Sequence, residues 1–287
     1  MRYFEPYTLN LSGRLMEVDS PVVMGILNVT PDSFYSGSRC TGEEAVRRRV
    51  RQIIDEGGRI IDIGGYSSRP MADDVTAEEE WRRLASGLRI VREEAPEAIV
   101  SVDTFRASVA ERCVGEYGVN IVNDISGGEL DGEMIPAVAR MKVPYVMMHM
   151  RGNPHTMSGL TDYEDVTADV MQFFGRKVKE AAYAGITDII IDPGFGFSKN
   201  LDQNYELLAR LECLRELGLP MLVGVSRKSM IYKLLGIEPD SSLNGTSVVN
   251  TLALLKGASI LRVHDVKEAV QAVAIVEKFR ACGPDGK

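Results

Sequence analysis

The chain has 287 residues, 45% of them hydrophobic and 26% charged, a composition typical of a globular protein with one large domain or two small ones. Because 33 Lys and Arg residues are outnumbered by 41 Asp and Glu residues, the net charge is -8 and the pI is near 5.1, which argues against a nucleic-acid or anionic-membrane partner. The cysteines are scattered without a CxxC pair, so we expect reduced thiols and neither disulfides nor a zinc site. Neither a secretory signal nor a run of ~20 apolar residues occurs, so we expect a cytoplasmic protein without a membrane span.

The predicted elements begin with a hairpin and continue as a repeat of strand and helix. Residues 1–20 alternate around a turn at Ser12-Gly13, which predicts a β-hairpin that closes the floor of a barrel. Short β-branched apolar runs then alternate with longer amphipathic stretches, as in a parallel sheet of βα units. The predicted strands are 22–29, 60–65, 99–104, 120–125, 144–150, 188–192, 220–225 and 260–264. The predicted helices include 43–56, 77–94, 105–115, 163–184, 204–217 and 266–279.

The number of repeats decides between two parallel-sheet architectures. Eight strands in a chain slightly longer than the ~250 residues typical of a (β/α)8 barrel favour that fold over an open doubly wound sheet. No linker or low-complexity stretch divides the sequence. We therefore expect a single α/β domain over residues 1–287, a (β/α)8 TIM barrel with an N-terminal β-hairpin.

Polar residues gather where the predicted strands end. They are Asn28, Asp32, 67–69, Asp103, Asn123, Asp124, His149, Arg151, Asp192, 226–229 and 262–265. TIM barrels carry their chemistry at this end of the strands and in the loops that follow. A rim to which seven or eight strands each supply a polar group predicts a deep site for a polar ligand rich in hydrogen bonds.

Eight sequence motifs resemble those of dihydropteroate synthases and occur in the order typical of that family. They are MGILNVTPDSF (24–34), IDIGGYSSRP (61–70), SVDT (101–104), VNDISGG (122–128), MMHMRGNPHTM (147–157), DPGFGF (192–197), GVSRKS (224–229) and ILRVHD (260–265). One such motif is weak evidence, but eight in register across nearly the whole chain are specific. The resemblance implies a homodimeric, Mg²⁺-assisted transferase of folate biosynthesis. It would join 6-hydroxymethyl-7,8-dihydropterin diphosphate to 4-aminobenzoate, and sulfonamides would target it.

For the pterin ring, the resemblance points to five residues at strand ends. Asp192 would accept from adjacent N–H and NH2 donors, Asn123 would match the mixed edge beside them, and Lys228 would donate to the ring carbonyl. Asp103 would stabilise positive charge as diphosphate leaves, and Arg262 could lie over the ring face. From the residues alone, the two acids could instead cap helices, Asn123 could pair with loop backbone, and Lys228 could lie on the surface.

The diphosphate is expected at Arg262 and His264. These residues alternate on one strand and therefore point the same way, so a cation and an imidazole can hold one anion. By resemblance, Asn28 carries the Mg²⁺ that bridges diphosphate oxygens, consistent with a hard ion that keeps most of its waters. Asn28 could equally be a turn former before Thr30-Pro31, and an isolated Arg or His is usually structural.

The 4-aminobenzoate pocket is expected from two loops and two further residues. By resemblance it comprises Asp32, Phe34, Ser68, Arg69, Pro70, Phe197 and Ser229. Phe197 could equally belong to the core, and Ser229 could be an ordinary N-cap. The second loop reads GGYSSRPM where the family commonly has GGESTRPG, so Tyr66 replaces an acid and the affinity for sulfonamides is left open. His149 and His155 are predicted to be a scaffold or rim residue and a loop residue.

The expected mechanism is a dissociative substitution without a covalent nucleophile. Mg²⁺, Arg262 and His264 would stabilise the leaving diphosphate, while Asp103 and Lys228 would support the pterin. Two alternatives remain open from the sequence: a methyltetrahydrofolate–corrinoid methyltransferase-like enzyme, which the NVTPDSF, SRKS and RVHD motifs disfavour, and a non-catalytic pterin-binding paralogue. The family suggests a homodimer, which an apolar helix at 248–255 would permit.

Overall fold

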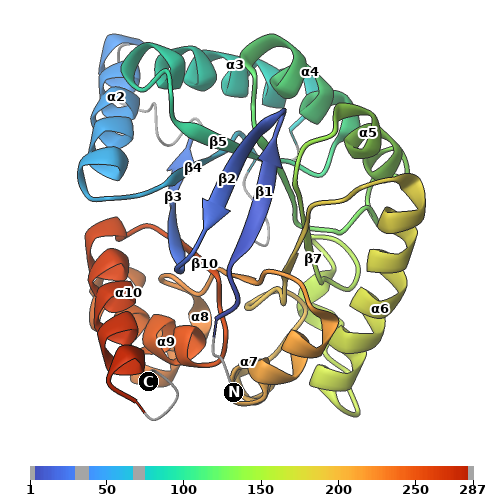
Figure 1. Cartoon of the computed structure of the whole chain (residues 1–287), viewed down its shortest axis with the longest axis vertical. Coiled ribbons are helices and arrows are strands. Elements are labelled where there is room, and N and C mark those ends of the chain that lie inside the picture. The colour runs from blue at the N-terminus through green and yellow to red at the C-terminus, as the bar shows by residue number, and fades with distance from the viewer. Residues whose placement is uncertain (1–3, 30–38, 67–74, 284–287) are drawn as a thin grey trace.

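The computed structural model describes residues 4–29, 39–66 and 75–283 (Figure 1). The strands are β1 (Tyr7–Leu11), β2 (Arg14–Val18), β3 (Val22–Asn28), β4 (Ile60–Gly64), β5 (Ile99–Asp103), β6 (Ile121–Asp124), β7 (Tyr145–Met148), β8 (Ile189–Asp192), β9 (Leu222–Val223) and β10 (Ile260–Val263). The α-helices are α2 (Arg39–Asp55), α3 (Ala77–Glu94), α4 (Ala107–Tyr117), α5 (Met134–Met141), α6 (Val166–Ala184), α7 (Leu201–Ala209), α8 (Ser229–Leu235), α9 (Leu243–Leu255) and α10 (Val266–Ala281). Short 3-10 turns are η1 (Met157–Gly159), η2 (Leu211–Leu217) and η3 (Pro239–Ser241).

The strands from β3 to β10 form one parallel sheet in the order β8-β7-β6-β5-β4-β3-β10-β9. A parallel bridge between Ile191 of β8 and Met221, just before β9, joins the two ends of this order, so the sheet closes into a barrel. The helices form a ring outside the strands, and the antiparallel pair β1–β2 lies across one end (Figure 1). The predicted (β/α)8 barrel with an N-terminal β-hairpin is confirmed.

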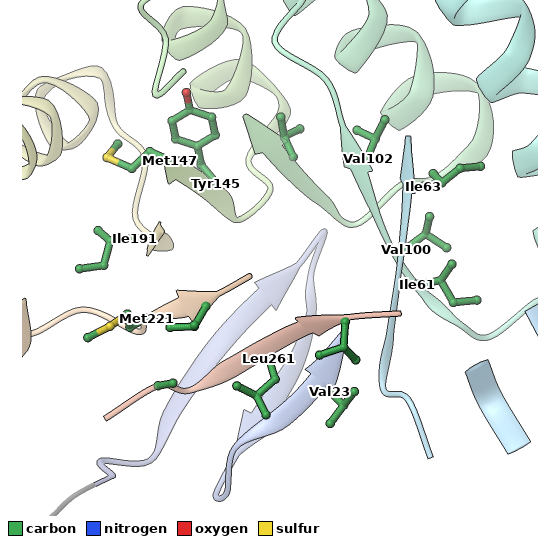
Figure 2. Close-up of a cluster of buried hydrophobic side chains, with 14 of the residues drawn as sticks. Val23, Ile61, Ile63, Val100, Val102, Tyr145, Met147, Ile191, Met221 and Leu261 are labelled. Atoms are coloured by element: carbon green, nitrogen blue, oxygen red, sulfur yellow. The ribbon is translucent and has the colours of Figure 1, made fainter. Parts of the chain in front are cut away.

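Successive side chains on each strand enter two different apolar cores, because they point to opposite faces of the sheet. Val23, Ile61, Val100 and Leu261 belong to the larger core, between the strands and the surrounding helices (Figure 2). The inner core contains Leu9, Leu11, Met16, Val18, Val22, Met24, Ile60, Ile121, Val146, Ile190, Leu222 and Ile260. The hairpin thus packs against the first residues of the barrel strands, and each large apolar side chain buried there contributes roughly 1.5–3 kcal/mol.

The barrel interior changes from apolar to charged along the strands. On β4, Ile60 belongs to the inner core and Asp62 follows on the same face; on β10, Ile260 belongs to it and Arg262 follows. Residues two apart on a strand point the same way, so each charged residue lies one step nearer the C-terminal end. The hairpin end is therefore filled with hydrocarbon, and the opposite end is left for polar chemistry.

Several helices differ from their predicted ranges, and two of these differences have a clear physical cause. The predicted helix 204–217 is divided into α7 and the 3-10 turn η2, because an apolar period does not distinguish an α-helix from tighter turns. Helix α6 begins after Asp165, whose side chain accepts a hydrogen bond from Ala168 N, so Tyr163 precedes the helix. Within the three described ranges, no helix is long and apolar enough to cross a membrane.

Candidate functional site

The register of the sheet brings together the C-terminal ends of β3, β4, β5 and β6. Asn28 pairs with Gly64, Gly64 with Asp103, and Asp103 with Asn123. A Cβ on Gly64 would lie 3.5 Å from the Asp103 Cβ and 3.8 Å from the Asn28 Oδ1. The glycine therefore leaves room for the polar side chains of Asn28 and Asp103 on either side of it.

An arginine from the last strand connects two acids from the opposite end of the sequence. Arg262 Nε donates to Asp62 Oδ2 at 2.6 Å, and its Nη2 donates to Asp103 Oδ2 at 2.5 Å. Asn123 Nδ2 donates to the same Asp62 oxygen at 3.2 Å. Because Asp62 is fully buried and accepts from both residues, it fixes the guanidinium and the Asn123 amide across the barrel interior.

Asp103 can change its charge near neutral pH. Burial raises the pKa of this carboxyl to about 7; Arg262 opposes the rise, and the carboxylates of Asp62, Glu80 and Asp124 add to it. Although burial acts to lower it, the pKa of Arg262 lies above its usual value because of Asp62 and Asp103. The site therefore pairs a titratable carboxyl with a permanent cation.

Asp192 ends β8 and begins a tight loop. Its Oδ1 accepts a hydrogen bond from Gly194 N at 2.8 Å, and burial raises its pKa, an effect that Lys228 opposes most. Lys228 Nζ donates to Phe195 O and lies 4.6 Å from the centre of the Phe197 ring. Burial lowers the pKa of Lys228 to about 8, against the attraction of Asp192. A carboxylate and an ammonium thus lie close enough for each to shift the pKa of the other.

His264 is neutral at pH 7, because burial, with the nearby Arg262 and Arg227, lowers its pKa to about 4. Its Nδ1 lies 3.2 Å from Ser226 Oγ, and its backbone N donates to the same oxygen at 3.2 Å. We assign the Ser226 hydroxyl as the donor to Nδ1, which leaves the proton of the neutral ring on Nε2. His264 can therefore donate one hydrogen bond to an anion at the rim.

Neither Asp103 nor Asp192 caps a helix in the structure. Helix α4 begins after Arg106, whose N donates to Thr104 Oγ1, whereas Asp103 accepts from the arginine of β10. Helix α7 is capped by Asn200, and Asp192 accepts from the loop before it. Both carboxylates are therefore part of the polar rim.

The remaining predicted residues fall into two groups. Lys228 is the N-cap of α8 and Ser229 its first residue, half-buried beside the rim. Phe197 is half-buried and packs on a small apolar cluster that includes Met148 and Ile125. The predicted residues that lie outside the described ranges are Asp32, Phe34, Ser68, Arg69 and Pro70.

Two buried charged residues that contact the predicted site residues or their loop were missed from the sequence. Asp62 is an acid between Ile61 and Ile63, and an acid inside an apolar strand is a signal that could have found it. Lys199 follows the DPGFGF motif, and lysine at the start of a helix is so common that the sequence gives no sign of its burial. His149, predicted as a scaffold or rim residue, is buried with Nδ1 3.0 Å from Lys199 Nζ.

Comparisons with known proteins agree with this geometry. Residues 24–264 match the family model described as pterin binding enzyme. The chain is 41% identical over 267 residues to a dihydropteroate synthase of Escherichia coli (strain K12), a match that covers 92% of this chain and 94% of that protein. The chain belongs to the dihydropteroate synthases. Members of this family are transferases of folate synthesis, and the family decides against the corrinoid methyltransferase alternative.

Two solved dihydropteroate synthases have closely similar folds. The enzyme of Xanthomonas albilineans, solved with 4-aminobenzoic acid, matches with a TM-score of 0.89 and 38% identity over 97% of this chain and 100% of that one. The enzyme of Yersinia pestis, solved with a sulfonamide drug, matches with a TM-score of 0.88 and 37% identity over 96% of this chain and 100% of that one. The whole barrel of this chain thus has counterparts in the dihydropteroate synthase family.

Proposed function

We propose that the chain condenses 6-hydroxymethyl-7,8-dihydropterin diphosphate with 4-aminobenzoate to give 7,8-dihydropteroate and diphosphate. The observation that carries the proposal is the convergence of Asp103, Asn123, Asp192, Lys228 and Arg262 at the C-terminal end of a barrel with the dihydropteroate synthase motifs. In the reaction the C–O bond to diphosphate breaks, a C–N bond to the arylamine forms, and the amine loses one proton.

The pterin is assigned to the buried acid and amide. Asp192 can accept from two adjacent ring donors, because Gly194 N occupies only part of the carboxylate's capacity. Asn123, held through its Nδ2 by Asp62, presents its carbonyl oxygen to the ring edge. Lys228, beside Asp192, supplies a donor for the ring carbonyl. The three groups match a flat ring with donors on one edge and an acceptor beside them.

Charge stabilisation is assigned to Asp103 and Arg262. As diphosphate leaves, positive charge grows on the pterin methylene and ring, and the ionised form of Asp103 stabilises it. Arg262 and the Nε2–H of His264 bind the departing anion. The amine then attacks a carbon already held in place, so positioning and electrostatics together account for catalysis without a protein nucleophile.

Mg²⁺ is proposed to bind between Asn28 and the diphosphate. Asn28 is exposed at the end of β3, and its Oδ1 is a hard oxygen ligand beside Asp103. Among the described residues, no group of three or more His, Cys, Asp or Glu side chains could hold a metal, so substrate oxygens and water would complete the coordination. The ion would neutralise charge on the leaving diphosphate.

The 4-aminobenzoate site is proposed beside Phe197 and Ser229. Phe197 offers a ring face next to Lys228 Nζ, and the Ser229 hydroxyl lies at the start of α8 near the rim. Loop residues Asp32, Phe34, Ser68, Arg69 and Pro70 are assigned here by family resemblance alone. We expect sulfonamides, which resemble the amine substrate, to compete for this pocket.

We propose a cytoplasmic location from the scattered, unpaired cysteines, and a homodimer from an exposed apolar surface. Val248 and Leu252 on α9 are 53% and 44% exposed, and Ile275 and Phe279 on α10 are each 67% exposed. Each pair is spaced four residues apart and forms a stripe, and the two helices pack against each other (Figure 1). Apolar stripes on adjacent helices are typical of an interface between subunits.

The deciding experiment measures diphosphate release by the purified protein. The purified protein is incubated with the dihydropterin diphosphate and Mg²⁺, with or without 4-aminobenzoate. The mass of the product is then measured by mass spectrometry. We expect release that depends on both substrates and a product with the mass of 7,8-dihydropteroate. Pterin binding without product would instead favour a non-catalytic paralogue, and no pterin binding would refute the site assignment.

A further inference from the structure

Lys199 is a buried lysine that lies behind the pterin site and belongs to none of the roles assigned above. It is 8% exposed, and its Nζ has three partners: Gly194 O at 3.0 Å, Phe197 O at 3.1 Å and His149 Nδ1 at 3.0 Å. Two of these partners lie in the loop between β8 and α7, and the third directly follows β7. One ammonium thus ties a loop to the neighbouring strand.

The surroundings of Lys199 suit a donor group. Burial lowers its pKa to about 7, Asp192 opposes the fall, and Lys228 and Arg151 add to it. His149, 3% exposed, is kept neutral because burial lowers its pKa to about 2, so its Nδ1 can accept the third hydrogen bond. A buried amine with three matched partners is costly to desolvate and is therefore not explained by packing alone.

The loop that Lys199 holds also carries the pterin contacts. The N–H of Gly194 donates to Asp192, and its carbonyl oxygen accepts from Lys199. This single residue therefore connects Lys199 to the carboxylate that is assigned to the pterin. Gly194 has a φ of +72°, and a Cβ there would lie 2.0 Å from His149 O. The backbone of the loop therefore packs directly against the backbone of His149, just after β7.

A second lysine also donates to a carbonyl of this loop. Lys228 Nζ donates to Phe195 O, whereas Lys199 Nζ donates to the carbonyls of Gly194 and Phe197. Three carbonyls within four residues thus point at two ammonium groups. Lys228 is assigned to the pterin, so the ring would compete for its protons when bound, whereas all three contacts of Lys199 are to the protein itself.

We propose that Lys199, supported by His149, is a positioning residue that fixes the 193–198 loop and thereby orients Asp192 and Phe197 toward the substrates. The inference rests on the proposed function, because it concerns the same pterin site. Lys199 touches backbone and His149, and its positive charge also acts to lower the pKa of Asp192. Its removal should therefore weaken pterin binding although Asp192, Asn123 and Lys228 are all still present.

The experiment compares three variants with the wild-type protein. Lys199→Met removes all three contacts and keeps the length of the side chain. His149→Phe removes one contact and keeps a ring to pack on Phe173, whose ring centre lies 5.0 Å away. Lys177→Met is the matched control, because Lys177 is 3% exposed and its Nζ contacts Glu180 and Glu129, neither of which is assigned to a substrate.

The measurements are the dissociation constant of dihydropterin diphosphate with Mg²⁺ by calorimetry, kcat and KM for both substrates, and the melting temperature. We expect about 10- to 100-fold weaker pterin binding in Lys199→Met, because the loop that carries Asp192 and Phe197 loses its hydrogen bonds to a charged group. We expect a smaller loss in His149→Phe and wild-type affinity in Lys177→Met. The KM for the pterin should rise more than kcat falls.

Each outcome has one meaning. Wild-type affinity in Lys199→Met, or an equal loss in Lys177→Met that follows the melting temperature, would overturn the positioning role. If Lys199→Met does not fold, His149→Phe decides, and unchanged pterin affinity in that folded variant would overturn the proposal. A wild-type protein that does not bind the pterin would count against the proposed function instead.

Discussion

Replacing Asp62 with Asn tests whether the buried acid beneath the site orients Arg262. The substitution keeps the volume and one acceptor oxygen but removes the charge that accepts from Arg262 Nε at 2.6 Å. Because Asp62 is fully buried and Arg262 is 20% exposed, solvent screens the pair weakly. A hydrogen bond between charged groups contributes about 1.5–3 kcal/mol. If this free energy is lost from the binding of the transition state, kcat/KM for the pterin should fall about 10- to 150-fold.

The same substitution has a predicted effect on pH dependence. The Asp62 charge is one of the influences that raise the pKa of Asp103, so its removal lowers that pKa. The ionised form of Asp103 is the working form in the proposed mechanism, and activity should rise as pH increases through its pKa. In Asp62→Asn the rising limb should therefore move to lower pH, although the maximum rate is reduced.

The assay is steady-state kinetics from pH 5 to 9 on the wild-type protein and two variants. Ser101→Ala is the control, because Ser101 is the cross-strand neighbour of Asp62, is equally buried and has no hydrogen-bond partner for its hydroxyl among the described residues. Removing that hydroxyl should leave kinetics unchanged. If folded Asp62→Asn kept the wild-type kcat/KM and pH profile, the orienting role of Asp62 would be wrong.

Asp103→Asn should abolish the rise in kcat/KM through pH 7, since burial raises the pKa of Asp103 to about 7 and the amide does not titrate; a persisting limb would contradict this. Gly194→Ala should weaken pterin binding at least tenfold in calorimetry, because Gly194 has a φ of +72° and an added Cβ would contact His149 O. In the control Gly175→Ala, the added Cβ meets open space on α6, so the free energy of unfolding should rise by roughly 0.5–1 kcal/mol. Phe279→Glu should convert the proposed dimer to monomer in sedimentation at micromolar concentration, and a wild-type protein that is already monomeric would refute the interface.

The sequence predicted the architecture well because the fold depends on local patterns. Each βα unit is recorded in a short apolar run followed by an amphipathic stretch, and the number of units alone favours a closed barrel. Barrel closure also carries every strand end to one rim. Asp103, Asn123, Asp192 and Arg262 could therefore be assigned to one site before any distance was known.

The family resemblance added roles that patterns cannot give. Spacing alone left Asp192 as either a ligand-binding residue or a helix cap, and the structure excludes the cap because Asn200 caps α7 instead. Helix ends were less well predicted, as in the segment that became α7 and η2, because apolar spacing is similar in both kinds of turn.

The sequence by itself determined the number of βα units, the barrel that they form and the rim to which its polar residues belong. Only the tertiary structure decided which of these residues touch. Arg262 and Asp62 are 200 positions apart, and Lys199 and His149 are 50 apart; each contact forms because closure of the barrel or the packing of neighbouring loops brings the pair together. The physical reason is that a two-residue period fixes the direction of a side chain, whereas its partners depend on how strands lie across the interior and on what burial does to the charges there.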